Sequence, residues 1–133
     1  MMGFASFFSW YKLNDVKNLI SENSTLNAQE VLNIINSHYA NVSDKLDQEV
    51  SPPERLINLI GNAFMSSNRL NKARALFRLN INNYPKSADA FEAMGDCYLF
   101  QSDTLNAIKT FKKGLEIGEN KVIQEKLEKL DKV

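Results

Sequence analysis

The sequence predicts an all-α fold in which antiparallel helix pairs repeat along the chain. A pattern of apolar, small and aromatic residues recurs at an offset of 34 residues, which is typical of stacked helix pairs. Only 5 glycines and 3 prolines occur in 133 residues, whereas a strand-rich chain normally uses more turn residues. With 44% hydrophobic and 24% charged residues, the composition is that of a globular protein with a core.

The first thirteen residues, MMGFASFFSWYKL, are mostly apolar. They lack the basic start and unbroken apolar run of a signal peptide, because Lys12 is the first basic residue and Ser6 and Ser9 interrupt the run. The segment is also too short to cross a bilayer as a helix. Its aromatics follow a helical spacing but spread onto several faces, which predicts a helix that docks against a partner. The predicted docking or oligomer surface consists of Phe4, Phe7, Phe8, Trp10 and Tyr11.

A second helix is predicted after residue 27. Asn27 and Glu30 have the spacing of a capping box, in which each side chain bonds the other residue's backbone N–H. Apolar residues then follow at intervals of three and four, which predicts an amphipathic helix of about four turns that shields the first repeat. These residues are Val31, Leu32, Ile34, Ile35, Tyr39 and Val42. Together the two helices form a predicted N-terminal segment, residues 1–50.

Residues 51–133 are predicted to form the repeat domain, with units at about 54–87 and 88–121. In Ser51-Pro52-Pro53-Glu54, a capping serine, a proline at the first helical position and a glutamate three residues after the cap predict a helix start. Small residues let the two helices of each unit approach closely while large residues fill the space around them. The residues that recur are Ile57, Ile60, Gly61, Phe64, Ala73 and Phe77, matched by Phe91, Met94, Gly95, Tyr98, Ala107 and Phe111.

This pattern resembles the tetratricopeptide repeat (TPR), a helix pair of 34 residues. The chain departs from the family at Asn80 and Gly114, where a small apolar residue is usual late in the second helix. We expect Asn80 to loosen the contact with the following helix.

Capping signals and a final helix agree with this register. Ser87 and Asp103 are predicted N-caps, and Gly118 is predicted to end its helix in a left-handed conformation. Beyond it, a helix at about 120–132 carries one apolar stripe, with lysines and glutamates elsewhere, as a terminal cap of a repeat array requires. We interpret that charge as a solvated face and not as a nucleic-acid site.

A longer stretch is similar to the C-terminal extension of bacterial esterase-type α/β-hydrolases, in which TPR units follow the catalytic domain. The matching marks are the pair His38-Tyr39, the SPPE turn at 51–54 and the segment NNYPKSADAFEAMGD. The sequence contains no GxSxG nucleophile motif. The resemblance therefore implies an accessory part whose catalytic domain lies outside this chain, and no catalytic residue carries over.

We predict that the chain is not an enzyme and holds no cofactor or metal. His38 is the only histidine and has no partner at ligand or catalytic spacing, so a packing or solvent-facing role is favoured. Cys97 is the only cysteine and fits a buried packing position, although a dyad with His38 is open. Phosphate-binding glycine loops are absent from the sequence.

The TPR resemblance implies a concave groove lined by the first helix of each unit. The positions it exposes there are Arg55, Asn58, Asn62, Asp89, Glu92 and Asp96. Three of these are carboxylates on one helical face, which would repel a peptide carboxylate and favour a basic or amine-bearing partner. The alternative is an acidic face that is merely solvated.

The expected function is therefore a non-catalytic module for protein–protein interaction or scaffolding, with the hydrolase accessory role as the alternative. Equal numbers of Lys+Arg and Asp+Glu, 16 each, argue against a nucleic-acid partner. No transmembrane segment or signal peptide is recognised, so the cytoplasm is the default location and no membrane contact is expected. The apolar opening favours self-association, and both a monomer and a dimer are open.

Overall fold

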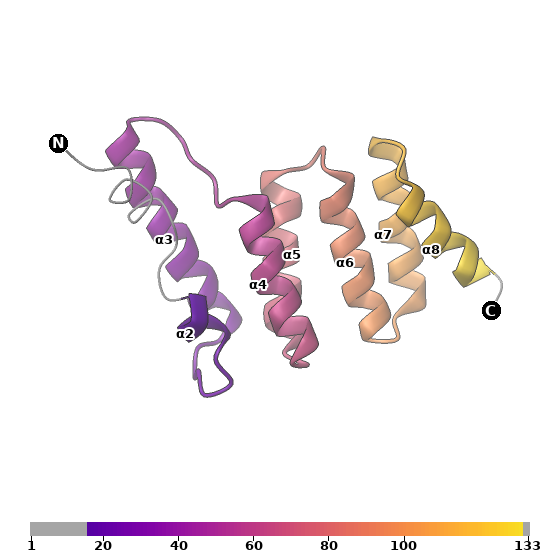
Figure 1. Cartoon of the computed structure of the whole chain (residues 1–133), viewed down its shortest axis with the longest axis horizontal. Coiled ribbons are helices and arrows are strands. Elements are labelled where there is room, and N and C mark those ends of the chain that lie inside the picture. The colour runs from indigo at the N-terminus through magenta and orange to yellow at the C-terminus, as the bar shows by residue number, and fades with distance from the viewer. Residues whose placement is uncertain (1–15, 132–133) are drawn as a thin grey trace. The chain divides into compact units, whose positions relative to one another are not determined.

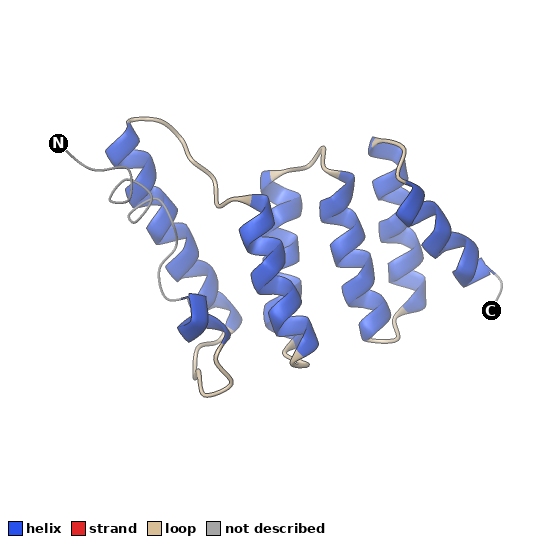
Figure 2. Cartoon of the chain, viewed as in Figure 1, coloured by secondary structure: helices blue, strands red, loops and turns tan. Residues whose placement is uncertain are grey.

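The computed structural model describes residues 16–131, and this part of the chain is built from seven helices without a strand (Figure 2). The predicted all-α class is therefore confirmed. The chain divides into two compact units, Met1–Pro53 and Glu54–Val133. The predicted aromatic docking surface lies outside the described residues, so self-association through it stays a prediction.

The first unit contains α2 (Val16–Ile20) and α3 (Ala28–Leu46). The predicted capping box is confirmed: the Glu30 N–H donates to Asn27 Oδ1 at 2.8 Å, and the Asn27 N–H donates to Glu30 Oε1 at 3.1 Å. Helix α3 has 19 residues and is longer than the predicted four turns. Its buried stripe is narrower than predicted because Ile34 lies beside that stripe and is 41% exposed. The buried residues are Val31, Ile35, Tyr39 and Val42.

The second unit contains five helices that pack side by side in chain order (Figure 1). They are α4 (Glu54–Ser66), α5 (Leu70–Asn83), α6 (Ala88–Phe100), α7 (Thr104–Ile117) and α8 (Lys121–Asp131). Helices α4 and α5 form one antiparallel pair and α6 and α7 the next, with α5 against α6 and α7 against α8. This pairwise packing is consistent with a helical repeat.

Two glycines allow close packing within the helix pairs. A Cβ atom on Gly61 would lie 2.6 Å from Phe77 Cε1, and one on Gly95 would overlap the ring of Phe111. Both phenylalanines are fully buried. The predicted need for a small residue in α4 and α6 therefore has a direct cause, which is an aromatic ring from the partner helix.

The helix starts are confirmed at two positions and displaced at a third. The Ala90 N–H donates to Ser87 Oγ at 3.4 Å, and the Asn106 N–H donates to Asp103 Oδ1 at 3.3 Å. Helix α4, however, begins at Glu54 and not at Pro52. The Glu54 carboxylate accepts a hydrogen bond from the Ser87 hydroxyl, so it connects the start of α4 to the N-cap of α6 instead of closing a capping box.

Asn80 makes a contact that was not predicted, and Gly118 differs from its prediction. Asn80 is 1% exposed, and its Nδ2 donates to the backbone carbonyl of Glu54 at 3.0 Å, so it connects α5 to the start of the preceding helix α4, a contact that the sequence did not predict. The predicted loosening toward the following helix stays a prediction. Gly118 has φ 179° and ψ 164°, so the predicted left-handed end of α7 is wrong. The backbone there is extended and leads into α8, which begins three residues later.

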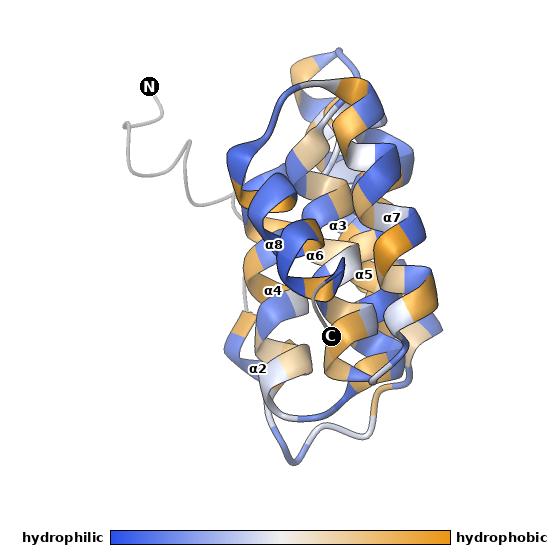
Figure 3. Ribbon diagram, turned by 90° about the vertical axis from the view of Figure 1, so that its right-hand side faces the viewer, coloured by the Kyte–Doolittle hydropathy of each residue, from blue (hydrophilic) through white to orange (hydrophobic). Residues whose placement is uncertain are grey.

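Helix α8 covers the end of the second unit. Ile123 is fully buried, while Leu127 and Leu130 are partly buried against the cluster formed by Ala107, Phe111 and Ile123. The Ile123 side chain needs the space beside Gly114, where a Cβ atom would lie 2.8 Å from Ile123 Cδ1. Figure 3 shows α8 as a mostly hydrophilic ribbon with a short apolar stretch. None of the helices described is both long and apolar enough to cross a membrane.

Candidate functional site: a groove on helices α4 and α6

A hollow of about 340 Å³ lies between α4 and α6 on the surface of the second unit. Two asparagines of α4 and three carboxylates of α6 line it, and Ala93 forms part of its floor. We call this hollow the α4/α6 groove, and its residues are Asn58, Asn62, Asp89, Glu92, Ala93 and Asp96. Five of these are positions predicted from the sequence. They come together because the 34-residue register places them on equivalent faces of neighbouring helices.

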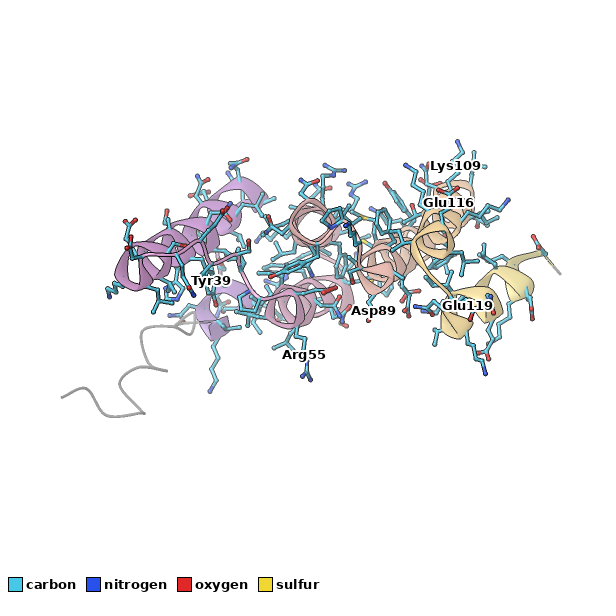
Figure 4. The ribbon with its side chains drawn as sticks, turned by 90° about the horizontal axis from the view of Figure 1, so that it is seen from above. Tyr39, Arg55, Asp89, Lys109, Glu116 and Glu119 are labelled. Carbon is cyan, nitrogen blue, oxygen red and sulfur yellow. The ribbon has the colours of Figure 1, made fainter. Side chains whose placement is uncertain are left out.

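The sixth predicted residue, Arg55, does not line this groove. It lines a smaller neighbouring pocket of about 120 Å³, and its side chain extends away from the helices in Figure 4. We call this second cavity the amide pocket, and its residues are Glu54, Arg55, Asn58, Asn80, Asp89 and Ala90. Asn58 and Asp89 belong to both cavities.

A lysine from the last helix pairs with two of the carboxylates that line the α4/α6 groove. Lys126 Nζ donates to Glu92 Oε1 at 2.9 Å and to both carboxylate oxygens of Asp96 at 2.9 Å. It also lies 5.9 Å from the centre of the Phe111 ring, within reach of a cation–π interaction. Burial alone would lower the pKa of Lys126, but the hydrogen bonds that it donates to Asp96 and Glu92, together with their negative charges, outweigh that effect and raise the pKa above its ordinary value of 10.5.

This contact corrects the prediction of three carboxylates that are all available to a partner. Glu92 and Asp96 are paired within the chain, and their side chains are only 22% and 34% exposed. Asp89 forms a weaker contact, since Asn120 Nδ2 donates to its Oδ1 at 3.3 Å. Asp89 is exposed and is therefore the carboxylate most open to a partner.

Sequence reasoning missed Lys126 because it assigned the lysines of the last helix to a solvated face. A signal was present in the register: Asn58, Glu92 and Lys126 follow one another at 34-residue intervals. Residues at equivalent positions of neighbouring repeats face the same side, so an acid and a base at this spacing can pair.

The two residues considered for chemistry, His38 and Cys97, belong to different units of the chain. His38 is half-buried on α3, with its ring edge-on to Tyr39 at 4.8 Å between centroids. Cys97 is buried in α6; desolvation raises the pKa of its thiol above the ordinary value of 9.0, more than Arg74 lowers it. Within residues 16–131, no three or more His, Cys, Asp or Glu side chains are grouped to hold a metal ion.

No protein-family model matches the chain, and no curated protein matches it. The resemblances to the TPR family and to the hydrolase extension therefore stay predictions that rest on the residues quoted for them.

Proposed function

We propose that this chain is a TPR-like interaction module that binds a protein or peptide in the α4/α6 groove and catalyses no reaction. The observation that carries the proposal is the groove itself. It gathers two asparagines and three carboxylates, which the 34-residue register had placed on one face, around a hollow of about 340 Å³.

The groove supports recognition of a peptide more than chemistry on a substrate. Asparagine side chains can both donate to and accept from a peptide backbone, and Asn62 is exposed at the surface of the groove. Asp89 adds a negative charge that favours a basic segment and disfavours a terminal carboxylate. Binding by such surface contacts needs only shape and charge, and both are supplied by rigid helices.

Because of Lys126, the two ends of the groove differ in charge. The end near α8 is neutralised by the ion pairs of Lys126, while the end near Asp89 keeps an exposed carboxylate. A basic residue of the partner is therefore expected to bind near Asp89, with less charged residues toward Asp96.

Selection of random peptides displayed on phage against the immobilised chain tests this proposal. A selected peptide is then titrated calorimetrically into the parent chain and into Asp89→Lys. Because a like charge would face the basic segment, Asp89→Lys should weaken binding by about tenfold or more.

Glu116→Lys is the matched control, because it makes the same charge change on α7. Glu116 and Asp89 lie on opposite sides of the second unit in Figure 4, and Glu116 is exposed. Binding to Glu116→Lys should stay within about twofold of the parent chain. The proposal is contradicted if no peptide is selected, or if both variants lose affinity equally.

A further inference from the structure

Two buried amide oxygens beside the groove have no hydrogen-bond partner. They are Asn58 Oδ1 and Asn80 Oδ1. The orientation of the Asn80 amide follows from its other end, because Nδ2 donates to the Glu54 carbonyl at 3.0 Å and a flipped amide would place two oxygens against each other. A buried acceptor without a donor destabilises the folded chain, because it has lost its hydrogen bonds to water. A bound water or a ligand that supplies a donor removes that cost.

Both oxygens belong to residues that line the amide pocket. Only 1% of Asn80 is exposed, so the pocket holds a deeply buried acceptor. Asp89 adds a carboxylate at the exposed side of the same pocket. Arg55 is the one cationic residue in the lining, and it extends away from the helices in Figure 4. The pocket is therefore rich in acceptors and carries negative charge.

We propose that the amide pocket binds a single ammonium group, namely the side chain of a lysine in the peptide that occupies the groove. This inference rests on the proposed function and gives it an anchor residue. An ammonium carries three donors and no acceptor, which matches Asn58 Oδ1, Asn80 Oδ1 and the Asp89 carboxylate.

Size and charge favour lysine over the other donors available in a peptide. The pocket volume of about 120 Å³ suits a compact ammonium on a slender stem. The planar guanidinium of arginine presents five donors in a rigid fork and is best matched by a bidentate carboxylate or phosphate. A hydroxyl would satisfy fewer acceptors and would leave Asp89 without a counter-charge.

One repeat further along, acceptor side chains of the chain bind an ammonium group of its own. Lys126 places its ammonium among acceptors of Glu92 and Asp96 at 2.9 Å. Glu92 is the residue that corresponds to Asn58 at the 34-residue interval. The same helical face thus accommodates one lysine from within the chain, and Asn58 is the residue of the amide pocket that shares this register.

Titration followed by 15N–1H NMR tests the proposal on the full chain. The probes are n-butylammonium and the peptide acetyl-Gly-Lys-Gly-amide, and the control probe is the same peptide with an acetylated lysine side chain. Both ammonium probes should shift the side-chain amide signals of Asn58 and Asn80 saturably, with Kd on the order of 1 mM. The acetylated peptide should not, because it lacks the charge.

Asn58→Leu removes one acceptor and should weaken binding of both probes about tenfold. Asn82→Leu is the matched control, because Asn82 is exposed on α5 and lines neither the α4/α6 groove nor the amide pocket. If Asn58→Leu fails to fold, Asn58→Asp replaces it and should bind the probes more tightly. Dispersed NMR spectra of each variant verify folding.

The proposal is overturned if the acetylated peptide shifts the same signals, if Asn82→Leu and Asn58→Leu respond alike, or if neither probe binds. If n-butylammonium binds and the lysine peptide does not, the claim that the ammonium belongs to a lysine of a peptide is overturned. If peptides selected for the groove bind equally well after their lysines are replaced, the proposed function stands and this inference fails.

Discussion

Lys126 on α8 lies 34 residues after Glu92 on α6, and its ammonium is 2.9 Å from the Glu92 carboxylate. Asp96, one turn further along α6, accepts from the same ammonium at the same distance. The final helix therefore pairs with two carboxylates of the α4/α6 groove and also covers the core with Ile123. Lys126 thus contributes to the stability of the second unit and reduces the negative charge of the candidate binding surface.

Replacing Lys126 with methionine should lower the free energy of unfolding by about 0.5–1 kcal/mol at pH 7, a modest loss because all three side chains are partly exposed. The pKa of Lys126 is raised in the folded chain above its ordinary 10.5, so its contribution is complete below that value and is lost as pH rises through the folded pKa. Urea unfolding of both chains should show a difference in unfolding free energy that is constant near pH 7 and shrinks as the pH rises above 10.5.

Lys129→Met provides the control for that measurement. Lys129 is an exposed lysine on the same helix, so its replacement should change the unfolding free energy by less than about 0.5 kcal/mol. Equal losses for the two variants, or a Lys126→Met difference that does not fall at high pH, would show that the ion pair is not the cause.

Replacing Gly95 with alanine should destabilise the second repeat. Alanine improves helix propensity by about 1 kcal/mol, but its Cβ atom would overlap the buried ring of Phe111, and overpacking typically costs about 1–3 kcal/mol. Denaturant unfolding should show the net loss. The additional change Phe111→Leu should recover part of it, because a smaller side chain frees the space at position 95.

Gly118→Ala is the comparison for Gly95→Ala. No atom lies within 4 Å of a Cβ placed there, and the extended backbone at φ 179° accepts any residue. This variant should be neutral or more stable by about 0.4–1 kcal/mol, since alanine reduces the freedom of the unfolded chain. A strong loss at Gly118 would contradict the extended conformation.

In the folded chain, the thiol of Cys97 should react slowly with an aromatic disulfide reagent such as dithiobis(nitrobenzoate). The side chain is fully buried, and desolvation raises the pKa of the thiol above 9.0. Reaction should accelerate at least about a hundredfold in denaturant, because modification requires opening of α6.

The same raised pKa of Cys97 gives a pH dependence of known sign. The stability it contributes is complete below pH 9.0 and is lost as pH rises through the folded pKa, because the unfolded chain releases the thiol proton first. In urea unfolding, Cys97→Ala should remove the loss of unfolding free energy that the Cys97 thiol causes above pH 9.0.

Rapid reaction of the Cys97 thiol in native buffer would contradict the predicted slow reactivity and would show that α6 opens readily.

Asn80→Asp should be among the most damaging single changes in the second unit. Aspartate cannot donate to the Glu54 carbonyl, and it places a charge at a site that is 1% exposed, so we expect a loss of about 3 kcal/mol or more. Asn82→Asp makes the same change at an exposed position of α5 and should cost less than about 0.5 kcal/mol. Thermal unfolding compares the two, and similar values would contradict the role of the Asn80 hydrogen bond.

Much of the architecture follows from short-range sequence signals. The capping residues Asn27, Ser87 and Asp103 mark helix starts because each needs only a nearby backbone N–H. The all-helical class and the groove positions at Asn58 and Glu92 follow from spacing, since helix geometry alone determines which residues share a face.

Those short-range signals do not predict contacts between residues that are far apart in the sequence. Asn80 departs from the repeat pattern, and its hydrogen bond to Glu54, 26 residues away, is a contact that short-range signals do not predict. The ion pairs of Lys126 and the orphaned oxygen of Asn58 depend likewise on how α8, α5 and α6 pack against their neighbours. Local chemistry specifies where helices begin and which faces are apolar, because those choices are made within a few residues. Which polar groups meet, and which remain without a partner, is decided only when distant helices come into contact and exclude water.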